Sequence, residues 1–280
     1  MSIPPKGKTR SRARGSSPKR PLEKDHALVL RRFPFGESSL LVHLLTPHHG
    51  RVVALAKGAY RLTSGYCGVL DLFHELEVSW RSSPNSEVGV LHMATLGRRR
   101  RNITRSLQRY EAASACLELA GLGARDAQPD PSLFGHLNVT LETLHQGLVS
   151  PQLATIAFDL GFLRCMGIAP ALEHCAACGK NLATERRRMV PFSAAAGGRL
   201  CDPCASEARR SGTRVGELPR PVMRVARSVL DAPLDGLSRV HLDGDLAQDL
   251  ERFVRRFVEY HLETQPRARA ATSPTIETRP

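Results

Sequence analysis

Two Cys-x-x-Cys pairs place the strongest constraint on the fold of this chain. Cys175 and Cys178 form the first pair, and Cys201 and Cys204 form the second after 22 intervening residues. Two such pairs hold one ion in a tetrahedron of thiolates, which favours zinc over iron. Because four sulfur ligands leave no open coordination position, we expect one structural Zn²⁺. The alternative is a free or redox dithiol, although a thioredoxin-type motif needs one pair near a βαβ pattern.

Length and hydropathy narrow the class of protein. The chain has 280 residues, which favours two domains over one. No apolar run is long enough to cross a membrane, and the basic N-terminus has no apolar segment behind it. Paired cysteines without an export signal indicate a reducing compartment. We therefore expect a cytoplasmic protein with no membrane partner.

The net charge of +13 is unevenly distributed. Residues 1–24 contain eight basic residues and one acidic residue but no periodic apolar positions, which predicts a disordered basic arm. Residues 264–280 contain three prolines and predict a disordered tail. A strongly basic chain favours nucleic acid over a membrane as its partner, although genome composition alone also produces arginine-rich sequences.

Residues 25–97 show the pattern of about five short strands separated by turns. Leu76, Val78 and Trp80 alternate with Glu77 and other polar residues, which is the period of a half-buried strand. Strands of this number and length match a small closed barrel such as an OB-fold. A small sandwich is the alternative.

After Gly97 the apolar period becomes that of a helix. One stripe runs from Leu133 to Leu148, and residues 152–166 are apolar nearly all round, which predicts a buried helix. We predict an α-helical domain at 98–263 that carries the zinc module at about 172–206. The expected fold class is therefore multidomain α+β.

The sequence has no catalytic motif. Nucleophile-elbow, Walker and dinucleotide-binding patterns are all absent, so we expect a protein that is not an enzyme. Cations beside turns are suited to phosphate contacts, and an aromatic ring among them is suited to base stacking. The predicted DNA-binding residues are Arg31, Arg32, Arg51, Lys57, Tyr60, Arg61, Arg98, Arg99, Arg100 and Arg101.

Several segments together resemble one bacterial family, the RecO recombination mediators. The N-terminal segments are A-L-V-L-R-R-F, F-G-E-S-S-L, L-L-T-P-x-x-G, A-K-G-A-Y-R and L-D-L-F. The later ones are F-D-L-G-F-L-R-C-M-G-I-A-P-A-L-E-H-C-A-A-C-G and F-S-A-A-A-G-G-R-L-C-D-P-C. They occur in the family's order and cover about residues 26–206.

The resemblance implies an N-terminal OB-fold, a helical C-terminal domain and a zinc-binding module. It also implies binding of single- and double-stranded DNA, strand annealing, and partnership with RecR and single-strand-binding protein to load RecA. Family members commonly have two adjacent basic residues where this chain has Tyr60 and Arg61, so stacking replaces one phosphate contact here.

We therefore expect a DNA repair and recombination mediator of the RecF pathway, cytoplasmic and associated with the nucleoid. One alternative is an RNA-binding or translation-associated OB protein with a zinc ribbon, which would prefer RNA over single-stranded DNA. A zinc-dependent nuclease is a second alternative, but it requires an open metal site and cleavage products.

Overall fold

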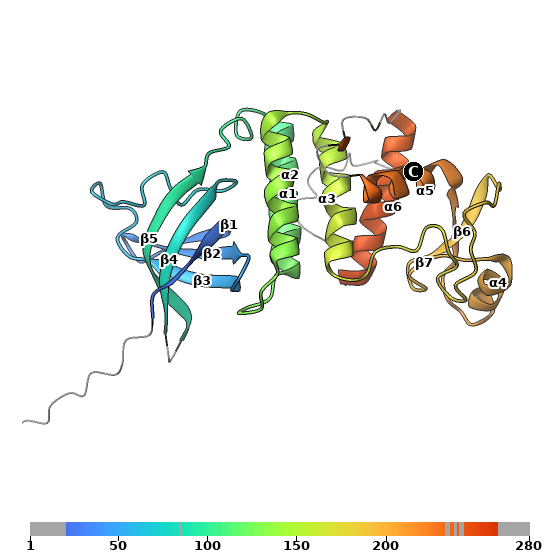
Figure 1. The fold of residues 1–280 in the computed structure, drawn as a ribbon, viewed down its shortest axis with the longest axis horizontal. Helices are drawn as coiled ribbons and strands as arrows, with labels where there is room; N and C mark the ends of the chain where they lie inside the picture. The colour runs from blue at the N-terminus through green and yellow to red at the C-terminus, as the bar shows by residue number, and fades with distance from the viewer. Residues whose placement is uncertain (1–20, 84–85, 233–235, 238–239, 241–243, 263–280) are drawn as a thin grey trace, which may run out of the picture.

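Five strands close into a barrel in the N-terminal part of the protein (Figure 1). They are β1 (Glu23–Phe35), β2 (Ser39–Thr46), β3 (Gly50–Ala56), β4 (Glu75–Ser83) and β5 (Ser86–Arg98). The order around the barrel is β1-β2-β3-β5-β4, with β3 parallel to β5 and the other neighbouring pairs antiparallel. This topology confirms the predicted OB-fold over the sandwich.

The computed structural model describes residues 21–83, 86–232, 236–237, 240 and 244–262. The predicted tail at 264–280 and most of the predicted arm lie outside these residues. β1 begins at Glu23, two residues before the predicted start of the barrel, because Glu23 and Lys24 pair with Trp80 and Ser79 of β4.

Alternating burial explains the strands. Leu76, Val78 and Trp80 of β4 are all at most 2% exposed and pack inside the barrel, as their spacing predicted. Leu40 and Val42 of β2 meet them in the same cluster. Alternate residues of a strand point to opposite faces, so the intervening positions form the outer surface of the barrel.

Five helices form the second part of the molecule. They are α1 (Leu107–Gly123), α2 (Pro131–Gln146), α3 (Pro151–Cys165), α5 (Arg220–Asp231) and α6 (Gly244–Leu262). Ser106, Asp130 and Ser150 cap the first three helices by accepting a backbone hydrogen bond. α3 is buried nearly all round and packs against α1, α2 and α6, which confirms the predicted buried helix.

A small sheet and a short helix form the third part, at the end of the molecule opposite the barrel (Figure 1). The strands are β6 (Met189–Ser193), β7 (Gly198–Arg199) and β8 (Gly216–Pro219), in the order β7-β6-β8, and the helix is α4 (Asp202–Arg210). The sequence did not predict this sheet, because strands of two to five residues are too short to show a period.

A second hydrophobic core, separate from the barrel interior, joins the barrel to the helices. Leu28, Leu45 and Phe73 of the barrel region belong to the same buried cluster as Ile103 and the facing sides of α1, α2 and α3. A backbone hydrogen bond of 2.9 Å from the Arg51 N–H to the Arg125 carbonyl joins β3 to the loop after α1. The two parts are therefore packed together rather than merely linked.

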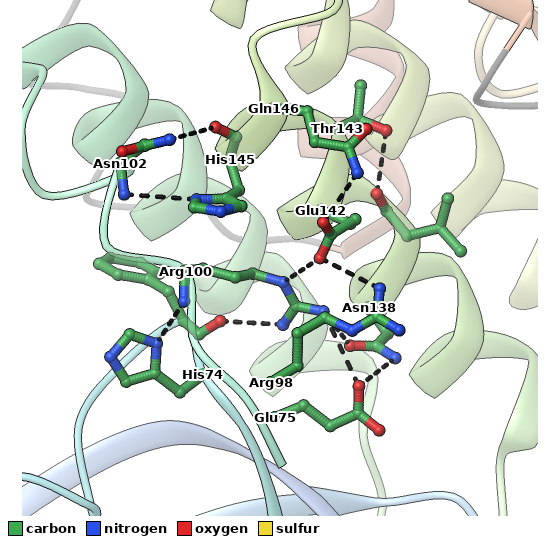
Figure 2. A network of polar contacts seen from close by, with 12 residues as sticks. His74, Glu75, Arg98, Arg100, Asn102, Asn138, Glu142, Thr143, His145 and Gln146 are labelled. Atoms are coloured by element: carbon green, nitrogen blue, oxygen red, sulfur yellow. Dashed lines mark hydrogen bonds and ion pairs between the residues drawn. The ribbon is translucent and has the colours of Figure 1, made fainter. Parts of the chain in front are cut away.

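Arg100 lies inside this interface (Figure 2). Its side chain donates to Glu142 and the Phe73 carbonyl, each at 3.0 Å, and to Asn138 at 2.7 Å. Its backbone N–H donates to Nδ1 of His74 at 3.0 Å, and burial lowers the pKa of His74, which keeps that nitrogen an acceptor.

Arg100 was predicted to bind DNA, and that prediction is wrong. The residue is 0% exposed, because α2 and the segment before β4 enclose the guanidinium and satisfy its donors. A phosphate would have to displace these partners to reach it.

We expect Arg100→Ala to lower the free energy of unfolding by about 3–5 kcal/mol, because it removes the cation from a buried ion pair and leaves the Phe73 carbonyl without its Arg100 donor. Urea unfolding measures this, with the exposed neighbour Arg99→Ala as the matched control, expected to change stability by about 0.5 kcal/mol or less. Equal stability of the two variants would contradict the structural role of Arg100.

Candidate nucleic-acid interface and metal centre

The four predicted metal ligands meet at one point. The Sγ atoms of Cys175, Cys178, Cys201 and Cys204 all lie within 4.8 Å of one another. The first pair comes from a tight turn in which the Gly179 N–H donates to the Cys175 carbonyl at 2.8 Å. Gly179 has φ +74°, a left-handed conformation that glycine adopts without strain. The second pair lies at the start of α4.

The electrostatics of this cluster favour a bound cation. Burial opposes ionisation of Cys175, but backbone N–H groups, including that of Cys201 at 3.4 Å, lower its pKa to about 6. Hydrogen bonds with the thiols of Cys201 and Cys178 raise the pKa of Cys204 to about 12. Four thiols so close together become thiolates together only when a cation offsets their charges. The donor set fits a tetrahedral metal ion.

A buried arginine fixes the loop beside the four-cysteine cluster. Arg199 is 5% exposed and donates to the Leu182 carbonyl at 2.9 Å and to Glu185. It thereby fastens the loop between the two cysteine pairs against β7. No sequence pattern indicated this role of Arg199.

The segment Lys57–Arg61 forms an exposed turn at one end of the barrel. Gly58 has φ +67°, and the Arg61 side chain folds over it. Tyr60 is 56% exposed, and its N–H donates to the Ser38 carbonyl at 2.9 Å, which ties the turn to the loop between β1 and β2. Lys57, Tyr60 and Arg61 therefore share one accessible edge.

The remaining arginines that were predicted to contact DNA from the barrel differ in whether they already have an acidic partner. Arg31 is exposed on the outer face of β1. Arg32 is exposed too but pairs with Asp71 at 3.1 Å. Arg51 pairs through two hydrogen bonds, of 2.6 and 2.9 Å, with Asp126, whose pKa it lowers.

Arg51 stays a predicted DNA contact, but it already has a partner within the protein. Its guanidinium is committed to joining β3 to the loop between α1 and α2. Sequence alone did not show this, because Asp126 lies 75 residues away along the chain.

The linker between β5 and α1 carries a second group of exposed cations. Arg98 is 58% exposed at its side chain and contacts Glu142 at 3.4 Å. Arg99 and Arg101 are exposed on either side of the buried Arg100. Arg105, which was not among the predicted residues, is exposed on the same linker.

Sequence reasoning also missed two exposed aromatic residues. Phe33 and Phe35 are 45% and 56% exposed on β1. The signal was present, because both continue the alternation of Arg31 beyond the buried run Ala27–Leu30.

Comparison with known families agrees with this arrangement. The family model "Recombination protein O N terminal" matches residues 21–99, which contain the barrel. The model "Recombination protein O C terminal" matches residues 104–270, which contain the helices and the four cysteines. The chain belongs to the RecO family.

Curated relatives in this family are named DNA repair protein RecO. The one from Rhodopirellula baltica is 37% identical over 182 residues, which are 64% of this chain and 65% of that protein. The one from Anaeromyxobacter sp. strain Fw109-5 is 31% identical over 237 residues, which are 84% of this chain and 89% of the relative. Among the described residues, this RecO-family chain has no helix that is both long and apolar enough to cross a membrane.

We expect Cys178→Ser to lose the bound metal ion and to lower the thermal midpoint, because a structural metal contributes folding free energy directly. Elemental analysis of freshly purified protein and thermal unfolding measure the two effects. Cys67→Ser is the matched control, since Cys67 is an exposed cysteine of the barrel region. A wild-type content far below one metal ion per chain would contradict the site.

A buried carboxylate in the barrel gives a pH prediction. The Asp25 side chain is 2% exposed. Burial opposes its ionisation, but the ring nitrogens of His48 and His49, at 2.9 and 3.0 Å, lower its pKa below 3.8. The unfolded chain therefore binds this proton at a higher pH than the folded chain. Asp25 thus stabilises the fold above about pH 3.8, and this contribution is lost as the pH falls through the lower folded pKa.

We expect Asp25→Asn to lower the free energy of unfolding at pH 7 by about 1.5–3 kcal/mol, the range for hydrogen bonds to a charged group. The variant should also lose part of the acid dependence below pH 5. Urea titrations from pH 3 to 7 test this, with the exposed Glu87→Gln as control. A variant with the acid profile of the wild type would refute the assignment.

Proposed function

We propose that this protein is a DNA repair and recombination mediator of the RecF pathway. It binds single- and double-stranded DNA, anneals complementary strands and, together with RecR, helps to load RecA onto strands coated with single-strand-binding protein. The observation that carries this proposal is an OB-fold barrel in a RecO-family chain, with Lys57, Tyr60 and Arg61 exposed along one edge.

The proposed mechanism is electrostatic. Lys57, Arg61 and the linker arginines Arg98, Arg99 and Arg101 neutralise the phosphates of two strands and reduce their mutual repulsion, so complementary bases pair. Contacts to phosphates carry no sequence information, so binding is sequence-tolerant and falls steeply with salt. The process needs no nucleotide and no bond cleavage, which fits a protein that is not an enzyme.

The proposed cofactor is one structural Zn²⁺. Cys175, Cys178, Cys201 and Cys204 would hold it, and it would supply a cross-link between the first cysteine turn and α4. Four sulfur ligands leave no place for a reactive water, which separates this site from the catalytic site of a nuclease. The proposed location is the cytoplasm, in association with the nucleoid.

The decisive experiment asks whether the purified protein anneals complementary DNA strands coated with single-strand-binding protein, without nucleotide. Annealing supports the proposal. Preferred binding of RNA over single-stranded DNA would instead identify an RNA-binding OB protein, and cleavage products would identify a nuclease.

We expect the double variant Lys57→Ala, Arg61→Ala to bind and anneal DNA poorly while it keeps its thermal midpoint and its metal. The loss of two phosphate contacts should reduce the salt slope on single strands by about 1.4, at about 0.7 for each contact. Arg209→Ala, Arg210→Ala on α4 removes the same charge at the opposite end of the molecule and is the matched control. Unaltered annealing with a lowered midpoint would show that these residues stabilise the barrel instead.

A further inference from the structure

The second half of β1 extends beyond its pairing with β4. β1 pairs with β4 only from Glu23 to Leu28, whereas its pairing with β2 continues to Phe35. Residues 31–35, here called the β1 extension, therefore have a strand neighbour on one side only. All five are exposed. The β1 extension is thus an exposed edge strand of the sheet that β2 and β3 continue.

One face of the β1 extension is aromatic. Phe33 and Phe35 are two positions apart, so their side chains lie on the same face, at a spacing of ~6.7 Å along the strand. The ring of His43, on β2, packs edge-on against the Phe33 ring, with 5.6 Å between the two ring centroids. Two large apolar side chains are therefore exposed next to each other on this surface, as is common in binding sites.

The charges around the two rings identify the kind of partner. Arg31 lies on the same face of β1, at the alternate position before Phe33. Lys57 and Arg61 lie on the turn whose Tyr60 is hydrogen-bonded to Ser38, beside the end of the extension. Cations next to flat aromatic rings fit a polyanion with exposed π-faces, which describes a nucleic-acid strand with unpaired bases.

We propose that Phe33 and Phe35 form a base-stacking subsite that makes the barrel prefer single strands to duplex. This inference rests on the proposed function and specifies the form of DNA that the barrel edge accepts. Bases in a duplex already stack on one another and are closed to the rings, whereas unpaired bases are accessible. When two DNA strands pair, their bases are no longer available for stacking on the rings, so the barrel binds the duplex product more weakly.

The test compares single-stranded thymidine homopolymer with duplex DNA at one salt concentration. Phe33→Ala and Phe35→Ala should each weaken single-strand binding by about 5- to 150-fold, with a duplex affinity within about twofold of wild type. The salt slope should stay unchanged, because no phosphate contact is lost, which distinguishes these variants from Lys57→Ala, Arg61→Ala.

Two further variants control for folding and for non-specific loss. Phe33→Leu, Phe35→Leu keeps apolar side chains on the β1 extension but removes the rings, and it should show the same single-strand defect with the wild-type thermal midpoint. Tyr260→Ala removes a similarly exposed ring, 53% accessible, from α6 and should leave both affinities unchanged.

Fluorescence reports stacking directly. The sole tryptophan, Trp80, is 2% exposed, so Phe35→Trp adds one accessible indole. Its emission should be quenched by the homopolymer and not by duplex. Equal losses on single strands and duplex, no loss at all, or loss only of self-association or of binding to anionic lipid vesicles would overturn the proposal.

The outcomes separate the two levels of inference. A wild-type protein that anneals strands, alongside ring variants with unchanged single-strand affinity, would overturn the stacking subsite alone. A wild-type protein that binds neither form of DNA would overturn both the subsite and the proposed function.

Discussion

The buried guanidinium of Arg100 joins the two larger parts of this protein, beside the hydrophobic cluster through which they pack. A charged group removed from water needs hydrogen-bond partners on every side, and Arg100 obtains them from both parts. Phe73 supplies a carbonyl from the barrel side, and Asn138 and Glu142 supply side-chain acceptors from α2 (Figure 2). Any rotation of the barrel against α2 would break some of these hydrogen bonds to Arg100. The linker backbone is therefore anchored at Arg100, between the exposed Arg99 and Arg101.

The four-cysteine cluster is organised by local chain geometry instead. Each cysteine pair is set by its own turn or helix start, and Arg199 fixes the intervening loop by contacts within the same module. This difference explains which features the sequence predicted. The spacing of Cys175, Cys178, Cys201 and Cys204 encodes the site directly, whereas the small sheet around it is held by pairings too short to leave a period.

The same distinction applies to the candidate DNA contacts. The barrel was predictable, because alternation and turn residues are local. The sequence could not show which arginine of the run Arg98–Arg101 is buried, because the burial of Arg100 depends on Asn138 and Glu142, about 40 residues away. The pairing of Arg51 was not predictable for the same reason, since its partner Asp126 comes from another part of the fold. Alternation along β1 places Phe33 and Phe35 on one face, but their exposure also depends on the end of the β1–β4 pairing at Leu28, which the sequence does not show.

In the proposed mediator, the cations and the aromatic rings of the barrel and linker bind different parts of DNA. Cations act on phosphates, which single strands and duplex both carry, so they bring strands together but cannot distinguish substrate from product. Rings act on unpaired bases, which disappear as pairing proceeds. A barrel with both kinds of group therefore holds strands before annealing more strongly than after it. Because the Arg100 contacts anchor the linker backbone, the loss of stacking weakens binding without any rearrangement of the protein. Release of the product then follows from base pairing itself.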